Sequence, residues 1–339
     1  MVTRCLLALG LSCTSVMATI TVTSSDFDTS NSQLQSAIAK LDTSLGSVTH
    51  SLFSVVGPGL STTMGQVGVS GARFDSNLPG WQVETSFGII TPGKQRGDEA
   101  LTSLPFLSAN LILGKRLGKN HFIQARGFYL PEISIKNSKA DFTFRQGNFG
   151  LSYIHLMKKP EEEFWGFAVL GQFDAGYSGG ELNAALAEKQ VSASFDPDGT
   201  GPSAADAAKL DFKFKDDFNL NWDVISLSSG IYLSRPFKHF DFIIGYMATL
   251  HIGSATLDNT ATGTIDTTFS PVSGTDVFET NDSANVVLKN TSIFRPNVVS
   301  HNLPFIMVFK LASFRASLAF SRNITANVNS FLLSAGVSF

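Results

Sequence analysis

Cysteine is nearly absent from this chain of 339 residues. Its two cysteines, Cys5 and Cys13, both lie at the N-terminus, in a segment that we expect to be removed on export. A mature chain without thiols has no disulfide, no cysteine metal ligand and no cysteine nucleophile. Any function must therefore rest on other side chains.

Charged residues and long apolar runs are also scarce. Asp, Glu, Lys and Arg make up 16% of the chain, against roughly 25% in soluble domains. Hydrophobic residues make up 43%, yet no run after residue 20 is apolar enough for a spanning helix. This combination favours a transmembrane β-barrel, the other structure that pairs every backbone polar group within lipid. The net charge of −3 predicts no basic patch, so we expect no nucleic-acid partner.

Residues 1–18 have the pattern of a secretory signal peptide. Arg4 supplies the positive charge, Cys5 to Ser12 form the apolar part, and Ala18 ends a small-residue cleavage site. We expect cleavage after Ala18. An alternative is lipidation of Cys13, although Gly10 stands where that signal prefers an aliphatic residue.

Residues 19–48 are expected to form a Ser/Thr-rich linker followed by a short helix. Apolar residues recur there with helical spacing, namely Leu34, Ile38, Leu41, Leu45 and Val48. Ser30 or Asn31 is available as the N-cap. Such a helix would either plug the interior of a barrel or pack on its periplasmic rim.

After Gly59 the hydrophobic period changes to two, the period of a β-strand, and this alternation persists to the C-terminus. In 81–89, for example, Trp81, Val83 and Phe87 alternate with polar or small residues. The predicted strands are 50–56, 65–73, 81–90, 104–114, 121–132, 142–157, 164–177, 222–235, 240–255, 303–310, 314–322 and 330–339. We therefore predict an all-β fold over residues 49–339, a transmembrane antiparallel barrel of about twelve strands. Hairpins within 209–218 or 261–287 would raise the number to fourteen, or would stand above the membrane.

The connections between these strands alternate in length. Short ones are expected near residues 74–80, 115–120, 158–163, 236–239 and 312–313, and long ones at 91–103, 134–141, 178–221 and 256–299. A membrane barrel has short periplasmic turns and longer extracellular loops. This rule places the last strand on a path toward the periplasm, where the C-terminus of a barrel belongs.

Polar residues that face inward by parity are the candidate functional residues. They are Glu84, Gln124, Arg126, Asp174, Asp241, His251 and Arg315. Charges of both signs along an open pore would select small polar solutes. Alternatively, they pair across a closed interior, because unpaired buried charges are costly.

An enzymatic barrel would need a histidine beside a serine and an orienting polar group. Only His251 is placed suitably, and no motif surrounds it. We therefore expect no catalytic residue, and neither a metal site nor a cofactor.

The last strand carries Phe331, Leu333, Ala335, Val337 and Phe339 on one face. This pattern resembles the C-terminal signature of outer-membrane barrels, and the resemblance implies insertion by the outer-membrane assembly machinery, with Phe339 as the signal. Segments 122–133 (FIQARGFYLPEI) and 147–160 (GNFGLSYIHLMKKP) also resemble a family of predicted outer-membrane barrels of unknown function. In its architecture the chain is similar to outer-membrane transporters of fatty acids and hydrocarbons, although their Asn-Pro-Ala hatch motif is absent.

These observations lead to an expected function. The chain is predicted to be exported to the outer membrane of a Gram-negative-type cell, and to act there as a passive channel or transporter for small or hydrophobic molecules. Its expected partners are outer-membrane lipid, the assembly machinery and an unidentified cargo. Two alternatives stay open: a non-conducting barrel for adhesion, surface recognition or envelope structure, and a lipid-hydrolysing barrel.

Overall fold

The fold was analysed in a computed structural model of the chain. The structure describes residues 19–22, 80–92, 106–136, 140–159, 166–195, 208–269, 283–296, 298–325 and 327–339. Among these residues, no helix is long and apolar enough to cross a membrane. The predicted signal peptide, the Leu34, Ile38, Leu41 and Leu45 helix, and the predicted strands at 50–56 and 65–73 lie outside the described residues.

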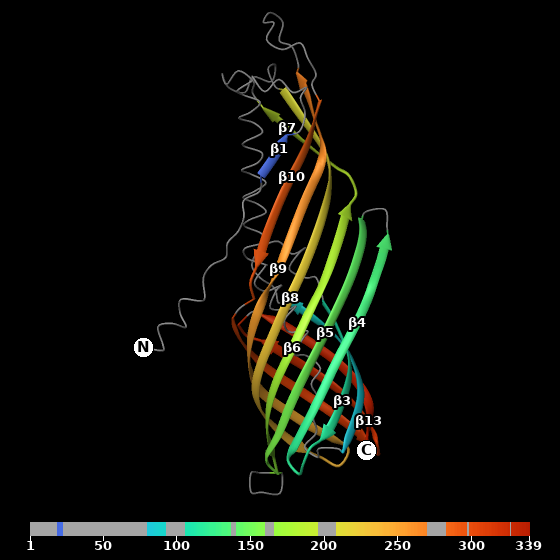
Figure 1. The fold of residues 1–339 in the computed structure, drawn as a ribbon, viewed down its shortest axis with the longest axis vertical. Helices are drawn as coiled ribbons and strands as arrows, with labels where there is room; N and C mark the ends of the chain where they lie inside the picture. The colour runs from blue at the N-terminus through green and yellow to red at the C-terminus, as the bar shows by residue number, and fades with distance from the viewer. Residues whose placement is uncertain are drawn as a thin grey trace, which may run out of the picture.

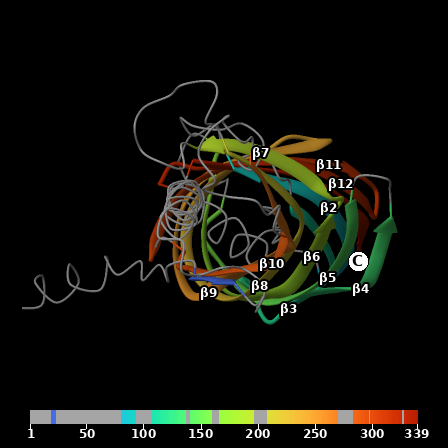
Figure 2. The ribbon, with the colours of Figure 1, turned by 90° about the horizontal axis from the view of Figure 1, so that it is seen from above.

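Ten strands close a ring, and every neighbouring pair is antiparallel. In ring order they are β2 (Trp81–Pro92), β3 (Phe106–Arg116), β4 (His121–Lys136), β5 (Ala140–Lys158), β6 (Ala168–Leu186), β8 (Ala208–Pro236), β9 (Phe240–Phe269), β11 (Val299–Leu311), β12 (Phe314–Asn323) and β13 (Val328–Ser338). Figure 2 shows this ring from above, and Figure 1 shows the tilt of its strands. The fold is therefore an all-β closed barrel.

The prediction of about twelve strands is wrong for this ring. The last strand, β13, pairs with β2 along its whole length, from Val328↔Pro92 to Ser338↔Gln82. Because this ladder is complete, no further strand fits between the two. Apart from 50–56 and 65–73, which lie outside the described residues, each predicted strand corresponds to one strand of the ring.

The first strand of the ring, β2, and the last strand, β13, meet at the end of the barrel that carries the short turns. There the backbone nitrogen of Trp81 donates to the carbonyl of Phe339 at 2.6 Å, and the nitrogen of Phe339 donates to the carbonyl of Trp81 at 3.0 Å. The turns at this end include 117–120, 237–239 and 312–313. We call it the turn end, and Figure 1 shows it at the bottom, beside the C-terminus.

The opposite end carries a sheet that continues beyond the ring, which we call the outer extension. It consists of residues 208–218 of β8 and 258–269 of β9, together with β7 (Lys189–Phe195), β10 (Ser283–Phe294) and β1 (Thr19–Val22). Figure 1 shows it above the barrel. Much of 178–221 and 256–299, predicted as long loops, is therefore strand. The alternative of a hairpin within 261–287 is confirmed, since β9 and β10 pair there from Gly263↔Val286 to Asp266↔Ser283, whereas the polar composition of the rest had hidden the strand pattern.

Outward-facing side chains form an apolar band around the ring. Large exposed members include Phe87, Leu111, Leu113, Phe149, Leu151, Phe173, Ile231, Ile244, Phe309, Leu318, Phe331 and Leu333. On the paired strands β8 and β9, the apolar band ends at the level of Ile225 and Ile252, which pair with each other. The next outward pair toward the other end of the barrel is Asp223 and Ser254, which are polar. A soluble protein would bury such a band, whereas a membrane barrel presents it to acyl chains.

Glycines on the wall allow close strand packing, and Gly88 is the tightest at the closure. A Cβ added there would meet the carbonyl oxygen of Phe331 and, at 2.7 Å, Cγ of Leu332. We expect Gly88→Ala to destabilise the barrel by about 1–3 kcal/mol, since the closing ladder cannot shift without losing hydrogen bonds. Unfolding in urea from lipid vesicles measures this loss.

Gly127→Ala is the matched control for Gly88→Ala. Its new Cβ would lie 3.6 Å from the carbonyl oxygen of Asn148, an ordinary contact. Equal losses of stability in the two variants would contradict the role assigned to Gly88.

Candidate functional site in the barrel interior

The seven candidate residues all lie on the inner face of the ring. Six are buried, with exposed fractions of 0–5%: Glu84, Gln124, Arg126, Asp174, Asp241 and His251. Arg315 is partly buried. The structure brings six of them together in three separate groups, and His251 lies apart from these. Their role in function stays a prediction.

The first group is a buried ion pair between β4 and β6. Nη1 of Arg126 lies 3.3 Å from Oδ1 of Asp174, and both side chains are 1% exposed. Arg126 also donates to Ser152, and Gln172 donates to the other carboxylate oxygen of Asp174 at 2.5 Å. The guanidinium lies over Gly150, where a Cβ would meet its Cζ at 2.6 Å. The charges are thus paired across the intervening strand β5.

A second group joins β2 to β4 across β3. Gln124 donates from Nε2 to Oε1 of Gln82 at 2.9 Å, and Gln82 donates to Glu84 at 2.5 Å. Gln82 and Gln124 both pair with Gly114 on the strand between them. Because Gly114 has no side chain, the two amides can meet above it. Gln82 was not among the candidates, and only its inward parity could have indicated it.

The third group lies near the turn end. Nζ of Lys310 is 2.6 Å from Oδ1 of the fully buried Asp241. Lys310 pairs in register with Arg315, which donates to Ser338. Sequence reasoning missed Lys310, although its parity with the inward Val308 could have indicated it.

His251 lies between two buried serines. Its Nδ1 is 2.8 Å from Oγ of Ser226 and its Nε2 is 3.0 Å from Oγ of Ser300. Both serines are fully buried, whereas a hydrolase must present its nucleophile to a substrate. The arrangement satisfies a buried histidine, and the expectation that the chain is not an enzyme stays a prediction.

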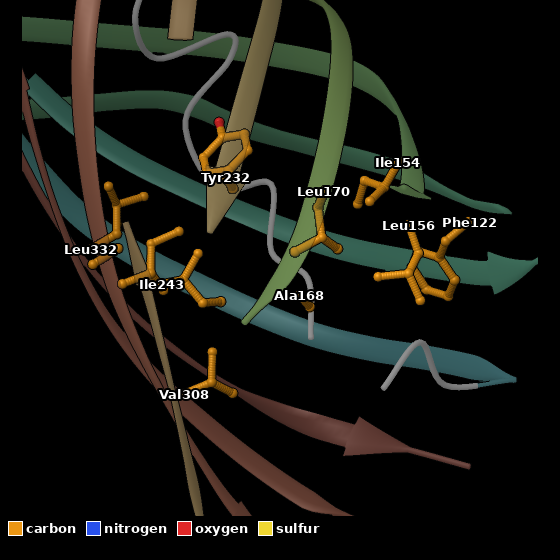
Figure 3. Packing of buried hydrophobic residues seen from close by; sticks show 11 residues of the cluster. Phe122, Ile154, Leu156, Ala168, Leu170, Tyr232, Ile243, Val308 and Leu332 are labelled. Carbon is orange, nitrogen blue, oxygen red and sulfur yellow. The ribbon is translucent and has the colours of Figure 1, made fainter. Parts of the chain in front are cut away.

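Apolar side chains from eight strands form the inner apolar layer (Figure 3). Its members are Phe122, Ile154, Leu156, Ala168, Leu170, Tyr232, Ile243, Ile306, Val308, Ala319 and Leu332, all 0–5% exposed. The two remaining ring strands, β2 and β3, contribute Gly88 and Gly114 at this level. A Cβ on Gly114 would meet Cζ of Phe122 at 2.5 Å, and one on Gly88 would meet Cγ of Leu332 at 2.7 Å. The layer thus reaches every wall of the ring.

A second apolar cluster, the outer apolar layer, lies where the outer extension begins. It consists of Ile90, Leu220, Trp222, Ala255, Leu257 and Val328, with Phe144, Leu182 and Phe218 packed against it. This layer brings side chains of β2 and β13 into contact with side chains of β8 and β9. These two pairs of strands are not neighbours in the ring, so the layer spans the interior. Sequence reasoning missed this layer, although extending the parity of β8 past Val224 places Trp222 and Leu220 inward.

These two apolar layers indicate that the interior is packed and is not an open pore. An open, water-filled pore leaves its lining exposed, whereas most inward residues of the described ring are buried. A ring of ten strands also lies close to the eight-stranded size whose interior side chains fill. Among the described residues, no three His, Cys, Asp or Glu side chains gather as metal ligands. The interior therefore combines two apolar layers with paired polar groups.

Removing one member of the buried ion pair tests its energetics. Asp174→Ala is expected to destabilise the barrel by roughly 3–5 kcal/mol, because Arg126 would keep a buried charge without its carboxylate. The double variant Arg126→Met, Asp174→Leu should recover most of that loss, since it removes both charges. Unfolding in urea from lipid vesicles measures both. A single variant as stable as the wild type would show that the pair is not buried.

No family model matches the chain, and no curated protein matches it. Among solved structures it is similar to the translocator domain of the autotransporter NalP from Neisseria meningitidis, with 8% identity, 92% of this chain and 100% of that chain covered, and a TM-score of 0.32. It is similar to the monoaromatic hydrocarbon channel CymD, with 11% identity, 84% and 97% covered, and a TM-score of 0.29. It is also similar to the toluene transporter TbuX from Ralstonia pickettii, with 8% identity, 84% and 94% covered, and a TM-score of 0.26. With scores this low, the barrel is established by its strand register alone.

Proposed function

We propose that this protein is an outer-membrane barrel that transports small hydrophobic molecules and conducts no ions. The observation that carries this proposal is the outer apolar layer. Six buried apolar side chains occupy inward positions at the end of the ring that faces the extension. Inward positions in a water-filled mouth would carry polar residues instead. An apolar molecule that enters the outer apolar layer replaces apolar contacts between side chains with apolar contacts of its own.

The direction of the barrel follows from its two ends. The turn end carries short connections and Phe339, as the periplasmic end of a membrane barrel does. The outer extension then stands outside the cell. In this orientation the chain is exported by its N-terminal signal and is inserted by the assembly machinery, which recognises Phe339. Its apolar band then contacts outer-membrane lipid.

Polar and charged solutes are poor cargo for this interior. A hydrated ion would have to leave its water to enter the outer apolar layer, which is unfavourable without compensating partners. The charges beyond that layer are already paired with each other. Transport of an apolar molecule therefore needs displacement of side chains, and the resting barrel is closed.

A second candidate function is surface recognition, and the outer extension favours it. Strands β8 and β9 have 29 and 30 residues, whereas about 9–11 residues suffice to cross a membrane. Beyond Ile252 the outward residues of β9 are Ser254, Thr256, Asp258, Thr260 and Thr262. Such a polar sheet suits contact with water or with a ligand outside the cell.

Quenching of Trp222 tests the transport proposal. The single-tryptophan variant Trp81→Phe, Trp165→Phe keeps only Trp222 of the three tryptophans. In detergent, 4-bromotoluene, an apolar contact quencher, is expected to quench Trp222 saturably. Leu220→Asn should weaken that binding about tenfold or more, since a buried leucine contributes about 1.5–3 kcal/mol of apolar burial.

Asn219→Ala is the matched control, because it changes the outward neighbour of Leu220 on the same strand. Planar bilayers containing the wild type should show no ion conductance. Steady conductance, or quenching that does not saturate, would refute closed hydrophobic transport.

A further inference from the structure

Two histidines lie side by side on the outward face of the barrel, near the turn end. His121 begins β4 directly after the turn at 117–120, and it pairs in register with His155 of β5. Their chain neighbours Phe122 and Ile154 belong to the inner apolar layer, so parity directs both histidines outward. The two rings are stacked, with centroids 4.7 Å apart. Imidazole groups this close can share one metal ion.

The spacing of the two rings is that of two ligands on a single ion. Imidazole nitrogens lie about 2.0–2.1 Å from a bound metal, so two rings that share it have centroids roughly 4.5–5.5 Å apart at bond angles of about 90–120°. The 4.7 Å between His121 and His155 falls within this range. Rotation of the rings about their Cβ–Cγ bonds would then turn one nitrogen of each toward the ion.

The hydrogen bonds of the two rings leave nitrogens for a ligand. Nδ1 of His121 is 2.6 Å from the hydroxyl of Tyr153. A histidine that binds a metal usually donates its other ring N–H to an oxygen in this way, which leaves Nε2 of His121 for the metal. Nδ1 of His155 is shielded from water and has no hydrogen-bond partner among the described residues. A metal ion would give that ring a partner.

A third ligand comes from a bulge just beyond His155. The register of β5 with β6 is irregular between Leu156 and Lys158, so Met157 is the extra residue there. A bulge re-aims the side chain that it carries. The thioether of Met157 lies over Gly171, where an added Cβ would be 3.7 Å from its Sδ. Gly171 is the register partner of His155, so the sulfur lies beside His155 on the side away from β4.

The chemistry of this row of side chains selects the ion. It offers two imidazoles and one thioether across β4, β5 and β6. Imidazole suits zinc, copper, iron and nickel, whereas a soft thioether selects Cu(I). Calcium and magnesium need oxygen ligands, and the part of the chain that the structure describes gathers no three His, Cys, Asp or Glu side chains. The ligand set therefore favours monovalent copper.

The row is also open to water. Met157 is 50% exposed, and both histidines are partly exposed. In the orientation proposed above, the turn end faces the periplasm. A copper ion could therefore reach these side chains from the periplasm without entering the barrel.

We propose that His121, His155 and Met157 form a binding site for Cu(I) on the periplasmic rim of the barrel, and that Tyr153 is a positioning residue that orients His121. The side chains of this site point away from the interior. The site is therefore independent of the transport function proposed above, and it gives the chain a second ligand of another chemical class.

Competition with a coloured chelator tests the site. The untagged full-length chain carries Cys5→Ser and Cys13→Ser, so that no thiol competes for copper. In detergent and without oxygen, it is titrated with Cu(I) in the presence of bicinchoninate, and we expect one ion per barrel. His121→Ala and His155→Ala should each weaken binding about tenfold or more, because loss of even an outer-shell partner costs roughly 10–100-fold in metal affinity.

Two methionine variants separate a copper site from an incidental pair of histidines. Met157→Leu removes the sulfur but keeps an apolar side chain of similar size. It should weaken Cu(I) binding about tenfold or more and leave the weaker binding of Zn²⁺ unchanged, since only copper uses the thioether. Met307→Leu is the matched control, because Met307 lies on another wall with Phe242 and Leu318 as its register partners. It should change neither affinity.

A second histidine and tyrosine on the outward face supply controls for the other variants. Nδ1 of His301 lies 2.6 Å from the hydroxyl of Tyr246, as in the first pair, but the register partner of His301 on β9 is Ala248. His301→Ala and Tyr246→Phe should therefore leave Cu(I) binding unchanged. Tyr153→Phe, in contrast, should weaken it about tenfold, through the orientation of His121.

Unfolding in urea from lipid vesicles shows whether each variant folds. Without copper, all variants should unfold near the wild-type urea concentration, because the altered side chains lie on the surface. With Cu(I), the wild type and the controls should need more urea, and His155→Ala should not. A wild type that binds no Cu(I) would overturn the site. So would wild-type affinity in His155→Ala or in Met157→Leu, or equal losses in His155→Ala and His301→Ala.

Discussion

The pairing of the last strand with the first strand of the ring is the constraint on which the structure depends. A sheet in lipid cannot leave an edge, because each unpaired N–H or C=O group within the hydrocarbon costs several kcal/mol. The ladder between β13 and β2 removes that edge over eleven register pairs. Once it forms, the number of strands, the direction of every side chain and the width of the interior are all determined.

Closure with ten strands has a direct consequence for the interior. The ring is too narrow for a wide aqueous channel, so its inward residues contact one another. Charges inside it must then be paired, as Arg126 and Asp174 are. Large side chains must find room above glycines, as Phe122 does above Gly114. The same closure that satisfies the backbone thus forces the interior to be packed.

Much of this fold could be predicted from the sequence, because a strand period of two shows which residues share a face. Ten of the predicted strands are present, and parity placed Glu84, Arg126 and His251 on the inner face. What failed was counting, since nothing local shows which strand will meet β13. The outer extension was predicted only in part, by the alternative of a hairpin within 261–287, because its outward residues are polar and 254–262 therefore looked like a loop. The apolar layers were missed because interior residues were expected to be polar.

The packed interior sets the energetic condition for any passage through the ring. The inner apolar layer joins side chains from eight strands, so a molecule that crossed it would separate contacts on eight walls at once. The polar groups add a second barrier, because moving Asp174 away from Arg126 would separate a buried ion pair, which is strongly unfavourable. The outer apolar layer has six buried members and could exchange its contacts for those of an apolar molecule without separating charges. It is therefore the part of the interior that an apolar molecule would enter at the lowest cost.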